Sequence, residues 1–182
     1  FGAPRQPGLV PEAKAKVEIL PPFNQHAAFQ GLEHFSHLWI LFVFHHCDQS
    51  SWKPTVRPPR LGGNRKIGVF ATRSGFRPNP IGQSVVELSA IQYDKGTVLL
   101  HLKGVDLIDG TPILDIKPYV AYCDSIATAK CAYANAAPAA SKRVTFMPSA
   151  REACQQLARN GYPDLEMLIV HTLELDPRPG YK

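Results

Sequence analysis

One stretch of the sequence combines positive charge with a stiff backbone. Residues 70–84 read FATRSGFRPNPIGQS, with Arg73 and Arg77 on either side of a Ser-Gly-Phe and two prolines after the second arginine. The prolines fix their own φ angles and restrict the residues before them to extended conformations, and Gly75 can take a positive φ. Arginines held in this way can bind a phosphate or a carboxylate. The alternative is a rigid exposed turn whose arginines only keep it soluble.

A second group of ionisable residues lies in residues 104–119, GVDLIDGTPILDIKPY. Asp109-Gly110 is a turn signal, and Asp115 and Lys117 are two apart, which places them on one face of a strand. Carboxylates and an ammonium group that meet at the end of a sheet can hold a ribose, orient a cation or move a proton. The alternative is a surface ion pair that contributes less than about 1 kcal/mol to stability.

Positive charge is concentrated in one part of the chain, whose formal net charge is +5. No acidic residue occurs between Asp48 and Glu87, and the rest of the chain is slightly acidic. Cations beside aromatic rings predict nucleic-acid binding, because Arg and Lys bind phosphates and rings stack on unpaired bases. A solvated basic face is the alternative. The cations are Lys53, Arg57, Arg60, Arg65, Lys66, Arg73 and Arg77, and the rings are Trp52, Phe70 and Phe76.

The histidines and cysteines do not indicate a metal centre. His45 and His46 lie beside Cys47, but adjacent strand residues face opposite sides and no further ligand is near in sequence. Four cysteines without a CxxC pair do not form a disulfide framework in a chain of 182 residues. We therefore expect reduced thiols, no metal and a cytoplasmic protein.

The elements that position these groups are expected to be mainly strands. The run 38–44, LWILFVF, reads as a strand buried on both faces, and Asp94-Lys95-Gly96 reads as a tight hairpin. A loop at 54–64 and an Ala-rich linker at 125–140 interrupt the pattern. A helical turn is expected at 25–35, and a helix is expected to begin at a capping box at 149–152 and to end at Asn160-Gly161. Strands are expected at 15–20, 38–44, 67–71, 83–93, 97–103, 113–116, 144–146 and 165–175.

This pattern predicts a mainly β fold. Residues 1–125 are expected to form a β-barrel or curled sheet, and residues 126–182 a linker with a small α/β extension. The hydrophobic fraction of 45% and the mean hydropathy of −0.14 are typical of a soluble globular protein, and no apolar run approaches the ~20 residues of a membrane helix. Because no GxGxxG follows a strand, a Rossmann cofactor site is not expected.

Several longer stretches of the chain resemble one known family. They are PRQPG (4–8), GLEHFSHLWILFVFH (31–45), WKPTVRPPRLGGN (52–64), GVFATRSGFRPNPIG (68–82), DLIDGTPILDIKPY (106–119) and DPRPGY (176–181). Together they closely resemble the bacterial TsaA-like family. Its members are S-adenosylmethionine-dependent methyltransferases that methylate N6 of threonylcarbamoyl-adenosine next to the tRNA anticodon. The resemblance covers nearly the whole chain.

The resemblance implies a single-sheeted β-barrel, unlike other methyltransferase folds, and a homodimer with the cofactor near the subunit interface. Family members begin with another strand before residues 4–8 and continue past residues 176–181, so we expect one barrel strand and part of the extension to be missing. Two non-enzymatic alternatives are a tRNA-binding module that uses the same basic surface and a barrel that senses S-adenosylmethionine.

The resemblance also implies the residues that contact S-adenosylmethionine, which carries a sulfonium, a carboxylate and an adenine. Arg5 or Arg73 suits the carboxylate, and Asp106 suits the ribose or the ammonium group. At His46, where relatives can carry glutamine, we expect a backbone contact. The expected cofactor-binding residues are Pro4, Arg5, Gln6, His45, His46, Arg73, Gln83, Lys103, Gly104, Val105 and Asp106.

Methyl transfer to a poorly nucleophilic urea-type nitrogen depends mainly on positioning, with a carboxylate helping to remove the proton. Asp109 and Asp115 are the candidate bases, and Lys117 and Tyr119 are expected to orient the substrate. Arg77 is expected to reach the anticodon-loop phosphates or the threonyl carboxylate. The expected tRNA contacts are Lys53, Arg57, Arg60, Arg65 and Arg77.

Overall fold

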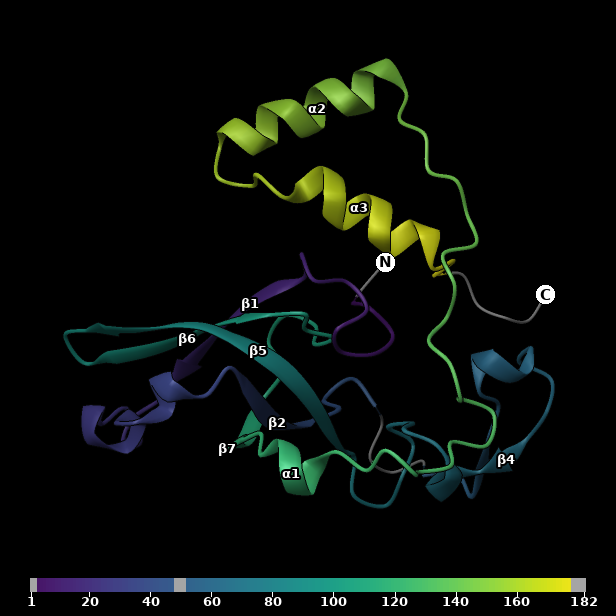
Figure 1. Cartoon of the computed structure of the whole chain (residues 1–182), viewed down its shortest axis with the longest axis horizontal. Helices are drawn as coiled ribbons and strands as arrows, with labels where there is room; N and C mark the ends of the chain where they lie inside the picture. The colour runs from purple at the N-terminus through teal and green to yellow at the C-terminus, as the bar shows by residue number, and fades with distance from the viewer. Residues whose placement is uncertain (1–2, 48–51, 178–182) are drawn as a thin grey trace.

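The chain is built around one antiparallel sheet of five strands (Figure 1). The computed structural model describes residues 3–47 and 52–177. Neighbouring strands follow the order β1-β6-β5-β2-β7. The strands are β1 (Lys14–Ile19), β2 (His37–Val43), β5 (Ile81–Asp94), β6 (Thr97–Lys103) and β7 (Ile113–Pro118), which confirms the strands expected at these places with nearly the same bounds.

One face of this sheet forms the core. Along β2, Leu38, Ile40 and Phe42 are buried, whereas the residues between them are only half-buried. The expectation that this strand is buried on both faces was wrong, because an antiparallel sheet with its core on one side alternates buried and accessible positions. On the accessible side, the indole N–H of Trp39 donates to the carboxylate of Asp124 at 2.9 Å.

The hairpin between β5 and β6 extends the sheet beyond the core. Asp94 and Thr97 are the last paired residues, and Gly96 between them has a φ of 78°, which confirms the predicted tight turn. Val98, Leu100 and Leu102 of β6 face the core. Strand β6 is therefore positioned by the apolar residues at every second position, which place one face of the strand in the core.

The five-stranded sheet is open. In the described part of the chain, β1 pairs only with β6 and β7 only with β2, so the two edges of the sheet do not meet. Closure into a barrel requires the edge strands to pair with each other in a staggered register. The mainly β fold is confirmed, and the predicted barrel closure is not observed.

A separate two-stranded sheet pairs β3 (Thr55–Val56) with β4 (Ile67–Gly68). Between them, the short 3₁₀ helix η4 (Pro59–Leu61) ends at Gly62, which has a φ of 73°. The expected loop at 54–64 is thus largely confirmed. The strand expected at 67–71 is only two residues long, because the 3₁₀ helix η5 (Val69–Ala71) follows at once and buries Val69.

Short helices and an irregular linker complete this part of the chain. The 3₁₀ helices η1 (His26–Phe29) and η2 (Leu32–His34) confirm the expected helical turn, and α1 (Ala121–Asp124) follows β7. The linker expected at 125–140 has neither helix nor strand. It runs outside the sheet toward the C-terminal helices (Figure 1).

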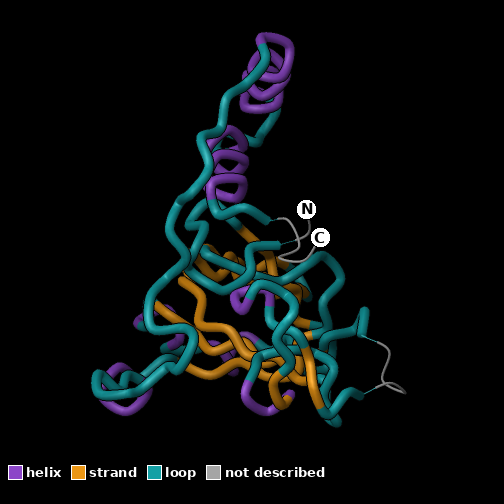
Figure 2. The backbone as a smooth tube through the Cα atoms, turned by 90° about the vertical axis from the view of Figure 1, so that its right-hand side faces the viewer, coloured by secondary structure: helices purple, strands orange, loops and turns teal. Residues whose placement is uncertain are grey.

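Two helices, α2 (Pro148–Arg159) and α3 (Leu165–Glu174), replace the expected α/β extension. They lie side by side and project from the sheet (Figures 1 and 2). The strands expected at 144–146 and 165–175 were wrong, since no strand occurs in the described residues after 125. A short apolar run such as LIV in α3 does not distinguish strand from helix by periodicity. The helix expected to end at Asn160-Gly161 is confirmed as α2, but the capping box was wrong, because α2 starts at Pro148 without a side-chain cap.

Polar contacts dock the helix pair on the N-terminal segment. The ring of His171 contacts the carboxylate of Glu12, with 2.7 Å between Nδ1 and Oε2, and Lys14 of β1 pairs with Asp164 before α3. Leu168 and Leu175 pack against the core of the sheet. No helix in the described residues is long and apolar enough to cross a membrane.

Candidate functional site

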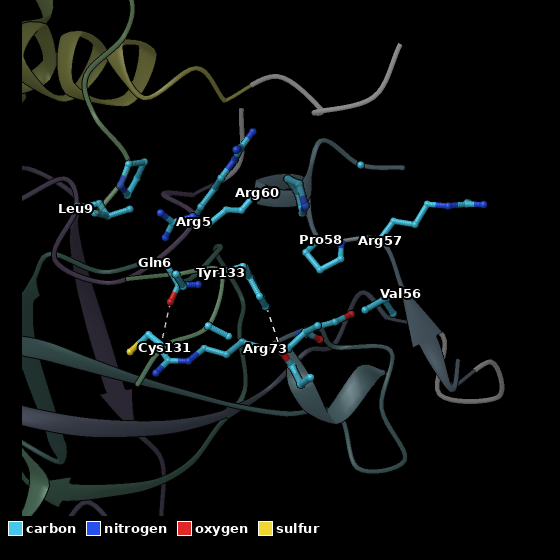
Figure 3. A pocket seen from close by; sticks show the side chains of 18 of the residues that line it. Arg5, Gln6, Leu9, Val56, Arg57, Pro58, Arg60, Arg73, Cys131 and Tyr133 are labelled. Carbon is cyan, nitrogen blue, oxygen red and sulfur yellow. Dashed lines mark hydrogen bonds between the residues drawn. The ribbon is translucent and has the colours of Figure 1, made fainter. Parts of the chain in front are cut away.

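A broad cleft of about 1690 Å³ opens beside the sheet (Figure 3). Its walls come from the N-terminal residues 3–10, the β3–β4 unit, the loop at 70–76 and the linker at 130–138. None of the described residues that line the cleft is Asp or Glu. Its cations are Arg5, Lys53, Arg57, Arg60, Lys66, Arg73 and Lys130, so the cleft is suited to an anionic ligand.

Four of the predicted cofactor residues meet in this cleft. The guanidinium of Arg73 donates to the side-chain carbonyl of Gln6 at 3.1 Å (Figure 3). Arg5 donates to the backbone carbonyl of Asp176 at 3.1 Å, which links the N-terminal segment to the end of α3. Pro4 lines the cleft beside them. Residues far apart in sequence thus lie in one cleft.

Residues 103–106 hold the N-terminal segment in place. The backbone N–H of Gly8 donates to the carbonyl of Gly104 at 2.8 Å, and the N–H of Val105 donates to the carbonyl of Ala13 at 3.1 Å. Gly104 has a φ of 66°, and a Cβ there would lie 3.3 Å from the backbone of Gly8. Glycine is required at this position both for its conformation and for the close approach.

The other predicted cofactor residues do not line the cleft. His45 and His46 follow β2, with their ring centroids 4.1 Å apart. Gln83 is exposed on β5 opposite Leu41, and Lys103 pairs with Glu87 at 3.1 Å. No group of three or more His, Cys, Asp or Glu in the described residues could hold a metal ion.

Asp106 accepts a hydrogen bond from a buried serine that the sequence analysis missed. The hydroxyl of Ser84 donates to the Asp106 carboxylate at 2.6 Å, and Ser84 is 1% exposed. Burial raises the pKa of Asp106, while the Ser84 hydrogen bond and the charge of Arg73 oppose that rise. No pattern around Ser84 signals this role, because a serine in an apolar strand also occurs without any function.

The side chain of Arg77 holds the loop that precedes it, residues 72–76. One nitrogen of the Arg77 guanidinium donates to the carbonyls of Thr72 at 3.0 Å and Ser74 at 3.2 Å. Gly75 does not use the positive φ that is open to glycine. Glycine is needed there for close packing, since a Cβ would lie 2.7 Å from the sulfur of Cys47 and 2.8 Å from the ring of Phe44.

The four predicted catalytic residues lie on and around β7, outside the cleft of a single chain. Asp115 and Lys117 form an exposed ion pair at 3.2 Å. The hydrogen bond from Lys117 and another from the Ile116 N–H lower the pKa of Asp115, which makes it a weaker base. Asp109 is exposed in the turn before β7, and the Tyr119 ring lies 6.0 Å from that of Trp39.

The predicted tRNA contacts are divided between the cleft wall and its surroundings. Lys53, Arg57 and Arg60 are exposed and line the cleft, and Arg60 donates to the carbonyl of Ala136 in the linker. Arg65 is exposed but is not among the described lining residues. In the described part of the chain, no ion pair neutralises any cation of residues 53–77.

Comparison with known proteins identifies the class. A family model for the tRNA-methyltransferase O N-terminal domain matches residues 1–125, and one for the TrmO C-terminal domain matches residues 139–182. A tRNA (adenine(37)-N6)-methyltransferase of Escherichia coli K12 is 51% identical over 182 residues, which are 100% of this chain and 77% of that protein. A Pseudomonas aeruginosa protein named as a candidate S-adenosylmethionine-dependent methyltransferase is 48% identical over the same coverage.

The solved structures agree with these matches. A crystal structure of TrmO from Pseudomonas aeruginosa has a TM-score of 0.77 and 42% identity, and the match covers 97% of this chain and 74% of that one. The chain thus has the fold and sequence of a tRNA methyltransferase. It belongs to the tRNA-methyltransferase O family, which confirms the resemblance seen in its motifs.

Proposed function

We propose that the chain transfers a methyl group from S-adenosylmethionine to N6 of threonylcarbamoyl-adenosine next to the tRNA anticodon. Its family makes it an S-adenosylmethionine-dependent tRNA methyltransferase, and the choice of this modified adenosine is the proposed part. One observation carries most weight: the cleft is lined by cations and by no acid among the described residues, as the binding of a polyanion requires.

The residues present fit the cofactor. Arg73, with Gln6 beside it at 3.1 Å, supplies donors for a carboxylate. Asp106 supplies a carboxylate for an ammonium group or for ribose hydroxyls, and the Ser84 hydroxyl fixes its orientation. When bound, S-adenosylmethionine supplies an electrophilic methyl group. The chain's own contribution is to hold donor and acceptor in line, which accounts for most of the barrier reduction in such displacements.

We also propose that the chain works as a homodimer in the cytoplasm. The residues proposed for proton removal and substrate orientation, Asp109, Asp115, Lys117 and Tyr119, lie outside the cleft of one chain. Strand β7 is an edge strand, and Leu114 on it is 54% exposed. A partner subunit at this edge would cover that surface and bring a second set of these residues toward a cleft. Light scattering should report a particle of twice 20.1 kDa.

The reaction is tested by mass spectrometry of tRNA nucleosides. Threonylcarbamoylated tRNA is incubated with the protein and S-adenosylmethionine, and the digest should contain threonylcarbamoyl-adenosine heavier by one methyl group. The matched control is the same tRNA without the threonylcarbamoyl group, which should gain no methyl. Methylation of both tRNAs would contradict the proposed substrate but not the enzyme class.

Two readouts separate the non-enzymatic alternatives. A tRNA-binding module would bind tRNA but give no heat with S-adenosylmethionine in calorimetry. A sensor would bind S-adenosylmethionine and transfer no methyl group. The proposed enzyme should bind both ligands and release S-adenosylhomocysteine only when the modified tRNA is present.

A further inference from the structure

Two aromatic rings of the acid-free segment, residues 53–77, are accessible in the wall of the cleft. Phe70 is 73% exposed and Phe76 is 36% exposed, and both line the cleft. Single exposed aromatic residues are common on protein surfaces and need no explanation. Two of them in one cationic cleft, on one short loop, form a surface that combines charge with flat apolar faces.

Phe70 is presented by a backbone that is fixed from several sides. It is the middle residue of η5, whose Val69 is 1% exposed. The hydroxyl of Thr72 donates to the carbonyl of Val69 at 2.8 Å, and the hydroxyl of Tyr133 donates to the carbonyl of Ala71 at 3.1 Å. The ring therefore projects from a rigid support, which lowers the entropy lost when a ligand binds to it.

Each ring has a cation beside it. The guanidinium carbon of Arg77 lies 5.8 Å from the centre of the Phe70 ring, and the Lys53 ammonium lies 4.6 Å from the centre of the Phe76 ring. Arg77 is itself bound to the loop backbone. Lys53 is tied to Phe76 a second time, because its backbone N–H donates to the Phe76 carbonyl at 3.1 Å.

We infer that Phe70 is a stacking platform for one unpaired base of the RNA loop, with Phe76 and Lys53 forming the neighbouring wall. The inference rests on the proposed function and adds to it the part of the RNA that this wall recognises. An unpaired nucleotide offers the flat π face of its base to the ring and its backbone phosphate to the flanking cations, and proteins bind single-stranded loops by this combination. Trp52 is also 50% exposed but is not among the described lining residues.

The test uses a 17-nucleotide RNA hairpin with an anticodon-type loop, in which 2-aminopurine replaces one loop base at a time. The fluorescence of 2-aminopurine falls when it stacks on a ring. With the unaltered protein, quenching should occur at one loop position. Phe70→Leu should abolish that quenching and weaken hairpin binding about tenfold, the size of one base–aromatic stack. Phe70→Trp should keep both the quenching and the affinity for the hairpin.

The control is Phe23→Leu, because Phe23 is 71% exposed and is not among the described residues that line the cleft. It should bind the hairpin as the unaltered protein does. The salt dependence of binding should be the same for Phe70→Leu and the unaltered protein, since no charge is removed.

Three results would overturn the inference. Phe70→Leu could bind and quench the hairpin normally while tRNA methylation by the unaltered protein is observed; this removes the platform and leaves the proposed function intact. Phe70→Leu could instead change the mass measured by light scattering without changing hairpin binding, which assigns the ring to a protein interface. If the unaltered protein neither binds the hairpin nor methylates tRNA, the proposed function and the platform fail together.

Discussion

The hydroxyl of Ser84 donates to the carboxylate of Asp106 over 2.6 Å, and it joins the buried face of β5 to the segment that follows β6. Burial makes the ionised form of Asp106 costly, and the Ser84 hydrogen bond, a backbone hydrogen bond and the charge of Arg73 offset part of that cost. The bond places a carboxylate where the core ends and the N-terminal segment begins.

Ser84→Ala should lower the free energy of unfolding by about 2 kcal/mol at neutral pH, because a charged acceptor loses its donor. Since burial raises the pKa of Asp106 in the folded protein, stability falls as pH rises from the ordinary value of 3.8 through the raised pKa and is level above it. Removing the donor raises the pKa further, so the variant should lose more stability at neutral than at acid pH. Urea unfolding of the variant and of the unaltered protein, at neutral pH and at acid pH, measures this difference in stability. In an Asp106→Asn background the cost of Ser84→Ala should no longer depend on pH.

Arg73→Ala should weaken S-adenosylmethionine binding by about 1.5 to 3 kcal/mol if Arg73 pairs with the cofactor carboxylate. Titration calorimetry gives the affinity directly. Arg159→Ala removes the same charge from the exposed end of α2 and should leave the affinity unchanged. Equal affinities for the Arg73 variant and the unaltered protein would remove Arg73 from the site.

Gly75→Ala should destabilise the protein by about 1 to 3 kcal/mol, the usual cost of forcing an extra carbon into a packed site. Its Cβ would lie 2.7 Å from the sulfur of Cys47 and under 3 Å from Phe44. Gly68→Ala is the matched control, because a Cβ there meets nothing within 4 Å and its φ is not left-handed. Thermal unfolding of both variants tests the difference, and a similar loss for both would show that the loop can shift.

The sheet could be predicted from the sequence because each strand carries its own signal. Val98, Leu100 and Leu102 are apolar at every second position of β6, and Gly96 marks the turn before them. Helix α3 could not be distinguished in this way, since its apolar run has no clear period and its contacts with α2 and the core decide its conformation.

The candidate site could be predicted only in part. The motifs gave Gln6 and Arg73 separately, and their contact at 3.1 Å depends on how the N-terminal segment folds back against Gly104. The Ser84–Asp106 bond joins residues 22 apart whose types and spacing carry no pattern. The linker residue Tyr133 donates to the carbonyl of Ala71, which is 62 positions earlier in the sequence, and no local sequence pattern predicts such a contact.

The acid-free segment of residues 53–77 can be tested as a phosphate-binding surface through its salt dependence. In the described structure none of its cations forms an ion pair with an acidic side chain, so most of their charge is available to a ligand. The logarithm of tRNA affinity should fall linearly with the logarithm of salt concentration, by about 0.7 for each contact with a single-stranded phosphate. A combined Arg57, Arg60 and Arg65→Ala variant should therefore make the slope shallower by about 2.

A matched triple variant distinguishes the loss of phosphate contacts in this segment from the general effect of a lower net charge. Lys16, Lys95 and Arg159 are exposed at other places on the molecule, and none of them is among the described residues that line the cleft. Their replacement by alanine removes the same charge and should change the slope far less. S-adenosylmethionine affinity should stay constant in both triple variants, because none of the six residues is proposed to contact the cofactor; a parallel loss of cofactor affinity would indicate damage to the fold. If the first triple variant binds tRNA with unchanged affinity and slope, the basic segment is only a solvated face and tRNA binds elsewhere on the molecule.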